Sequence, residues 1–175
     1  MTLTGGEYDV IEVFRTVIKN APYGKYAAVA QYKIGLYLSE KRMYQEARDE
    51  FDKVINDYPQ SEWVKAAKYQ IAVVDAARSS SPQYDQRVTK VATEEFEEFV
   101  KSYPDAQLSA KAKAEVAALN DKEAENNYLV AKFYVKQKKY EAAKIYFNII
   151  IEDFPNSSWA PLAAGQLRIL EKKNK

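Results

Sequence analysis

Carboxylates are the only strong acid–base side chains that this sequence offers for chemistry. Its 175 residues include no histidine and no cysteine, which excludes nucleophile–histidine catalysis, thiolate metal sites and disulfide bonds. The densest carboxylate groups are Glu94-Glu95, Glu97-Glu98 and the pair Glu123 and Glu125. General acid–base catalysis needs environments that separate an acid from a base. These glutamates lie among lysines on predicted helix faces. We therefore interpret them as solvated charge and predict no enzyme, no catalytic residue, no metal and no cofactor.

The charge balance gives no reason to expect binding to nucleic acid or to an anionic membrane surface. The chain has 26 basic and 25 acidic residues, a net charge of +1, and the two signs alternate along it. A protein without a strong electrostatic field has little long-range attraction for polyanions. No run of about 18 apolar residues occurs, so the sequence predicts no membrane-spanning helix.

The elements that must position any binding side chain come from an internal repeat. In each copy an aromatic residue is followed seven residues later by Tyr, Phe or Ala, and then by Pro. The four copies run from Phe14 to Pro22, Phe51 to Pro59, Phe96 to Pro104 and Phe147 to Pro155. An alanine lies four residues before each of the last three phenylalanines. These matches indicate repeated units that stack on one another to bury their apolar faces.

Apolar residues at three- and four-residue steps between the prolines predict helices that pair into hairpins. Gly35 lies inside one of them, where it costs about 1 kcal/mol relative to Ala, and we attribute it to close approach of a neighbouring helix. The Ser- and Pro-containing segment 79–85 predicts a loop. Residues 108–138 contain no helix breaker and predict one long helix shared by two repeats, with a kink near Asn126-Asn127 as the alternative.

We therefore predict an all-α, right-handed tetratricopeptide-repeat solenoid of about nine helices and no strand. Its single domain covers residues 7–175, with a partial first repeat at 7–22, repeats at about 25–59, 62–104 and 108–155, and a terminal helix at 158–172. Small residues, aromatic residues and a terminal proline match the tetratricopeptide pattern in two copies. These are Gly35, Ala47, Phe51 and Pro59 in one copy, and Ala131, Tyr134, Ala143, Phe147 and Pro155 in the other.

Three segments, in order, carry a more specific resemblance. They are Val17-Ile-Lys-Asn-Ala-Pro-Tyr-Gly-Lys-Tyr-Ala27, Ser81-Pro-Gln-Tyr84 before Val100-Lys-Ser-Tyr-Pro104, and Tyr128-Leu-Val-Ala-Lys-Phe-Tyr134. With these segments, the chain resembles the BamD family of outer-membrane assembly lipoproteins from about Tyr8 to Lys172. Family members carry a signal peptide and a lipidated cysteine. Because this sequence has neither, we expect membrane attachment only through a lipid anchor absent from it.

The resemblance implies a non-enzymatic scaffold of the β-barrel assembly machinery at the periplasmic face of the bacterial outer membrane. Its N-terminal repeats would receive unfolded outer-membrane barrel precursors. Its C-terminal repeats would dock onto a BamA-like partner that carries POTRA domains, and other assembly lipoproteins would be further partners.

Two sets of residues are candidates for these contacts. Tyr32 and Leu36 occupy positions of one repeat equivalent to Tyr69 and Val73 of the next, on the helices that line the inner groove of such solenoids. Aromatic and aliphatic side chains there could hold an apolar peptide segment. The alternative interpretation is packing between hairpins.

The second set lies on the comparable face of the long helix. Lys132 and Lys136, with Tyr128, are candidates for docking an acidic partner, and an ordinary solvated face is the alternative. Trp63 and Trp159 begin helices at matched positions. We predict that both tryptophans pack between repeats, with contact to a ligand as the alternative.

Two other function classes stay open on the sequence. One is a different repeat-containing adaptor of the cell envelope, for example one that coordinates envelope division. The other is the non-catalytic helical part of a peptidoglycan-cleaving enzyme.

Overall fold

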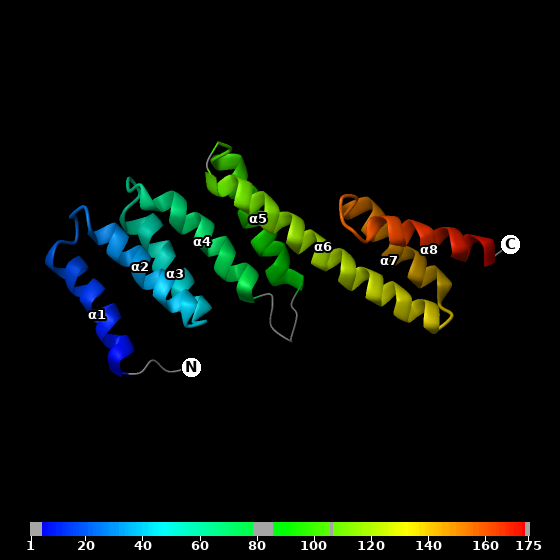
Figure 1. Ribbon diagram of the computed structural model, residues 1–175, viewed down its shortest axis with the longest axis horizontal. Helices are drawn as coiled ribbons and strands as arrows, with labels where there is room; N and C mark the ends of the chain where they lie inside the picture. The colour runs from blue at the N-terminus through cyan, green and yellow to red at the C-terminus, as the bar shows by residue number, and fades with distance from the viewer. Residues whose placement is uncertain (1–4, 79–85, 106, 174–175) are drawn as a thin grey trace. The chain divides into compact units, whose positions relative to one another are not determined.

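The computed structural model describes residues 5–78, 86–105 and 107–173, which form α-helices and no strand (Figure 1). The eight helices within these residues are α1 (Gly5–Asn20), α2 (Ala27–Glu40), α3 (Tyr44–Asp57), α4 (Trp63–Arg78), α5 (Gln86–Ser102), α6 (Gln107–Lys136), α7 (Tyr140–Asp153) and α8 (Ala160–Lys173). The predicted all-α fold of helical hairpins is confirmed. The predicted loop at 79–85 lies outside the described residues.

The number of helices is eight in the described residues rather than about nine. The long helix α6 runs without interruption from Gln107 to Lys136, so the predicted continuous helix is confirmed. No proline or glycine occurs within α6, and these are the residues that most often break or kink a helix.

The chain divides into two compact units, Met1–Ala112 and Lys113–Lys175. In the first unit each helix from α1 to α4 packs against the next one in sequence, and α2 also contacts α4. In the second unit α7 packs against α8 and also contacts the C-terminal part of α6 through the rings of Phe147 and Tyr128. The organisation of the whole chain as a single solenoid stays a prediction.

The hairpin turns after α2 and α6 share one unusual backbone geometry. Arg42 and Lys138 have φ angles of 60° and 58°, in the left-handed region that non-glycine residues seldom adopt. In each turn the next amide reaches back into the helix: Met43 N–H donates to the Leu38 carbonyl at 2.9 Å, and Lys139 N–H donates to the Tyr134 carbonyl at 3.0 Å. These bonds satisfy carbonyl groups at the helix end and reverse the chain direction.

Three of the four repeated phenylalanines lie in the core of the two units, and Phe14 is half-buried. Phe51, Phe96 and Phe147 are each 0% exposed, as are the alanines one helical turn before them, Ala47, Ala92 and Ala143. An alanine at this spacing leaves room on the helix face for a large ring to lie against the neighbouring helix. The repeat found in the sequence is therefore a repeat of core packing.

The interior glycine of α2 does mark a close contact with the neighbouring helix, but the contact is with a side chain and not between two backbones. A Cβ atom added to Gly35 would lie 2.6 Å from Cε1 of Phe51. The close neighbour is thus an aromatic ring of α3 that rests on the α2 backbone. A glycine within a helix lowers helix stability relative to alanine, but its missing side chain leaves the room in which this ring is buried.

Candidate functional site

The predicted peptide groove begins with Tyr32, and this side chain is buried. The residue is 8% exposed, and the centroid of its ring lies 5.5 Å from that of Phe51 and 5.0 Å from that of Trp63. Burial raises the pKa of the Tyr32 hydroxyl, and a hydrogen bond with Gln70 partly offsets this shift. Tyr32 therefore joins α2 to α3 and α4 through aromatic packing.

Tyr69 has the same role one repeat later. It is 9% exposed, and its ring packs edge-on against Phe96 at 5.8 Å and Phe99 at 5.6 Å between centroids. The other two groove residues, Leu36 and Val73, are half-buried. Because both tyrosine rings are largely covered by the protein's own aromatic residues, Leu36 and Val73 are the more accessible apolar members. Peptide binding at this face stays a prediction.

The docking set on α6 separates into one inward and two accessible residues. The Tyr128 ring packs against Phe147 and Trp159, with centroid distances of 5.5 and 5.1 Å. This arrangement repeats the contacts of Tyr32 in the first unit. Lys132 is half-buried and Lys136 is exposed. The two lysines are therefore the members of the set that a partner could reach, and docking there stays a prediction.

Sequence reasoning missed two apolar side chains on the same face of α6. Leu129 and Phe133 are 59% and 57% exposed. They alternate with Lys132 and Lys136 at helical steps of three and four residues, so the four side chains share one face. This mixed apolar and basic surface, which we call the α6 face, is defined by Leu129, Lys132, Phe133 and Lys136.

The ring contacts also decide the role of the tryptophans. Trp63 lies at the start of α4 and contacts Tyr32 of the preceding hairpin. Trp159 makes the equivalent contact with Tyr128. The predicted packing of both tryptophans between repeats is confirmed.

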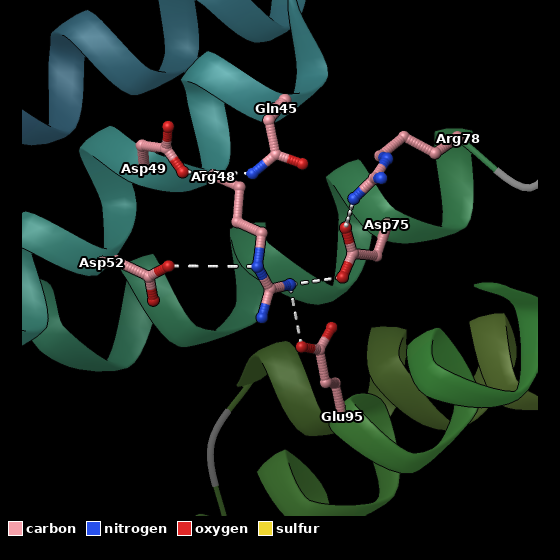
Figure 2. A network of polar contacts seen from close by, with 7 residues as sticks. All are labelled: Gln45, Arg48, Asp49, Asp52, Asp75, Arg78 and Glu95. Carbon is pink, nitrogen blue, oxygen red and sulfur yellow. Dashed lines mark hydrogen bonds and ion pairs between the residues drawn. The ribbon is translucent and has the colours of Figure 1, made fainter. Parts of the chain in front are cut away.

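A polar network in the first unit has no counterpart among the predicted sites (Figure 2). Arg48 of α3 donates through Nη1 to Glu95 of α5 at 2.9 Å and to Asp75 of α4. Its Nε lies 3.9 Å from Asp52. Arg78 makes a second contact with Asp75 at 3.1 Å. Asp75 is buried, with 4% of its surface exposed, so paired charge holds three helices together at this point.

Two carboxylates of this network, Glu95 and Asp52, are incompletely compensated. Burial raises the pKa of Glu95, and the hydrogen bond and charge of Arg48 oppose the shift without cancelling it. Burial likewise raises the pKa of Asp52, again against the attraction of Arg48. Arg48 contacts three carboxylates, and its single positive charge does not balance their negative charge. The sequence carried no signal for this network, because its members lie 27 and 47 residues from Arg48 and belong to no motif.

Within the described residues, no group of three or more potential ligands could hold a metal ion. The same residues include no helix long and apolar enough to cross a membrane.

Comparison with known proteins gives one finding. A family model, YfiO, described as outer membrane lipoprotein, matches residues 9–175, which is nearly the whole chain. No curated protein matches.

Proposed function

This chain belongs to the YfiO family of outer membrane lipoproteins, and we propose that it acts as a non-enzymatic scaffold in the assembly of outer-membrane β-barrel proteins. The family places it in association with the outer membrane. We propose that it acts at the periplasmic face of that membrane. There it would bind unfolded barrel precursors, a BamA-like partner with POTRA domains and other assembly lipoproteins. The observation that carries the proposal is the family match across residues 9–175.

The architecture supports a binding role. Stacked helical hairpins produce extended surfaces that hold protein segments, and their function comes from the side chains on those surfaces. The two units carry different surfaces: half-buried apolar residues on α2 and α4 in the first, and the α6 face in the second. We assign a different partner to each of them.

Barrel precursors are assigned to the first unit. Leu36 and Val73 are the accessible apolar side chains of the predicted groove, on the adjacent helices α2 and α4. The buried rings of Tyr32 and Tyr69 support this face from below through their contacts with the core. An unfolded client loses chain entropy when it binds, so the affinity should be in the micromolar range or weaker.

A peptide titration tests this assignment. A labelled peptide with the aromatic end of a barrel precursor is titrated against wild type and a Leu36→Ala/Val73→Ala variant, after thermal melts show that the variant folds. We expect the variant to bind at least fivefold more weakly. A matched control, Ile145→Ala/Leu162→Ala, removes two exposed aliphatic side chains from the second unit and should bind as wild type does. Equal loss in both variants, or none in either, would place the client elsewhere.

The POTRA-bearing partner is assigned to the α6 face. Its two lysines favour an acidic surface on the partner, and Leu129 and Phe133 add apolar area that docking would bury. A pull-down with purified POTRA domains tests the assignment, using Lys132→Glu/Lys136→Glu. The control is Lys111→Glu/Lys113→Glu, which reverses two exposed lysines on the same helix.

We expect the first charge reversal to abolish capture and the control to retain it. If the wild-type protein binds neither the POTRA domains nor the barrel peptide, the result favours a different adaptor of the cell envelope.

A further inference from the structure

A cleft on the first unit lies outside both surfaces assigned above. It has a volume of about 410 Å³ and is formed by α3, α4 and α5. This volume lies in the lower part of the range of about 300–1,000 Å³ for ligand pockets. Neither Leu36 nor Val73 lines it. A ligand of this cleft would therefore be distinct from the barrel precursors and POTRA domains assigned to the other two surfaces.

The floor of the cleft is apolar. Ile71 of α4 and Phe99 of α5 are buried beneath it, and Val91 of α5 is 43% exposed. An exposed valine at the edge of a buried apolar floor offers surface that a second apolar group would cover favourably.

The rim of the cleft is acidic. Asp52, Glu94 and Glu98 line it, and their pairing within the chain is weak. Asp52 lies 3.9 Å from Arg48, Glu94 lies 4.0 Å from Lys90 with both side chains largely exposed, and Glu98 accepts a hydrogen bond from Ser102. Exposed ion pairs at such distances contribute little stability, so these carboxylates remain available to another cation.

The cations that line the cleft already have partners. Arg48 is held by Asp75 and Glu95. Lys68 lies over the ring of Tyr103, with its ammonium nitrogen 5.7 Å from the ring centroid. The lining contains four carboxylates, the three on the rim and Glu95, against these two cations. Burial raises the pKa of both Asp52 and Glu95, as expected where negative charge is incompletely compensated.

We propose that this cleft binds a protein segment in which a lysine or arginine lies beside an aliphatic residue. The basic group would meet Asp52, Glu94 and Glu98 at the rim. The neighbouring aliphatic group, together with the stem of the basic side chain, would cover Val91 and the floor. Charge complementarity selects the sign of the partner, and the apolar floor distinguishes it from a simple polycation.

Synthetic peptides test the specificity. The full chain is titrated with three labelled peptides of equal length: alternating leucine and lysine, alternating leucine and glutamate, and alternating serine and lysine. We expect the leucine–lysine peptide to bind at least tenfold more tightly than either of the others. Its affinity should fall as salt rises from low to physiological concentration. Equal binding of the leucine–glutamate peptide would overturn the proposal, and equal binding of the serine–lysine peptide would remove the apolar part of it.

Charge reversal at the rim tests the location. Glu94→Lys/Glu98→Lys should weaken binding of the leucine–lysine peptide at least tenfold. The control, Glu62→Lys/Glu97→Lys, makes the same change in net charge at two exposed glutamates outside the cleft and should weaken binding less than threefold. If both variants lose affinity equally, the attraction is a property of the whole surface, and the cleft is not the site.

Discussion

Replacement of Gly35 by alanine should destabilise the first unit, although alanine is the better helix former. The new Cβ would lie 2.6, 2.8 and 2.9 Å from three atoms of the Phe51 ring. Ordinary contacts between carbon atoms are about 3.5–4.0 Å, so the closest pair is short by about 1 Å. Phe51 is fully buried, and its ring packs on Tyr32. The ring therefore has little room to withdraw.

The expected magnitude follows from two opposing terms. Alanine in place of an interior glycine stabilises a helix by about 1 kcal/mol. Forcing an extra carbon into a close-packed core costs about 1–3 kcal/mol, and three short contacts to one confined ring place this case near the upper end. We expect Gly35→Ala to lower the free energy of unfolding by about 1–2 kcal/mol.

Gly165 provides a matched control in α8. A Cβ atom there would meet nothing within 4 Å, and the residue is exposed. Only the helix-propensity term applies, so Gly165→Ala should raise the free energy of unfolding by about 0.8–1 kcal/mol. The same substitution should thus have opposite signs at two helical glycines.

Urea unfolding followed by tryptophan fluorescence can measure each unit separately. The chain has two tryptophans: Trp63 in the first unit and Trp159 in the second. Gly35→Ala is measured in a Trp159→Phe background, and Gly165→Ala in a Trp63→Phe background. Each remaining tryptophan packs against a tyrosine of its own core, so its emission should report local unfolding.

A double-mutant cycle identifies the cause. Leucine at position 51 removes the ring, so Gly35→Ala should cost less in a Phe51→Leu background than in wild type. The second unit has alanine, Ala131, at the position equivalent to Gly35, so the fold itself accepts a methyl group there and the predicted cost depends on the position of the Phe51 ring. If Gly35→Ala is neutral or stabilising, the Phe51 ring can shift to accept a methyl group, and the reasoning from the fixed ring is refuted.

Four further predictions concern the core, the ion-pair network and a turn. Phe147→Ala should lower the free energy of unfolding of the second unit by about 3–5 kcal/mol in urea titrations, because the ring is fully buried; a change under about 1 kcal/mol would show that the packing is misassigned. Arg48→Met should lower the free energy of unfolding of the first unit by about 3 kcal/mol, since buried Asp75 would lose one of the two arginines that pair with it in the described part of the chain, and an unchanged urea midpoint would contradict this. Lys138→Gly should raise stability by about 0.5–1 kcal/mol in urea titrations by relieving its positive φ; a loss would contradict the turn assignment. Because burial raises the pKa of Glu95, its contribution to stability is fully present below the unfolded pKa of about 4.3 and is lost as pH rises through the folded pKa. Wild type should therefore lose stability relative to Glu95→Gln between pH 4 and pH 7, and parallel pH profiles in urea titrations would refute this.

The sequence by itself determined the helices and their pairing. Alanine, phenylalanine and proline at fixed spacing specify a hairpin through local geometry, because side chains three and four residues apart share one helix face. This is why Phe51 and Phe147 could be assigned to the core, and why residues 108–138 could be predicted as one helix. It is also why Gly35 could be assigned to a close contact, although the contact proved to be with a ring.

The degree of burial of the predicted groove was decided only by the tertiary structure. Sequence position placed Tyr32 and Tyr69 on the correct helices, but the same face of a helix can point to solvent or to the next hairpin. Trp63 covers the first ring, and Phe96 and Phe99 cover the second. Such contacts depend on how each hairpin is rotated relative to the next one. The spacing of apolar residues within one helix does not predict that rotation.

The ion-pair network and the acidic cleft were likewise decided by packing alone. Arg48, Asp75 and Glu95 each look like an ordinary charge on a helix surface, and the separations of 27 and 47 residues match no motif. They meet because α3, α4 and α5 pack in succession. The free energy of a charge depends on what surrounds it in space. The sequence therefore predicts the helices that carry these residues, and only their proximity in the folded structure determines their ion pairs and pKa shifts.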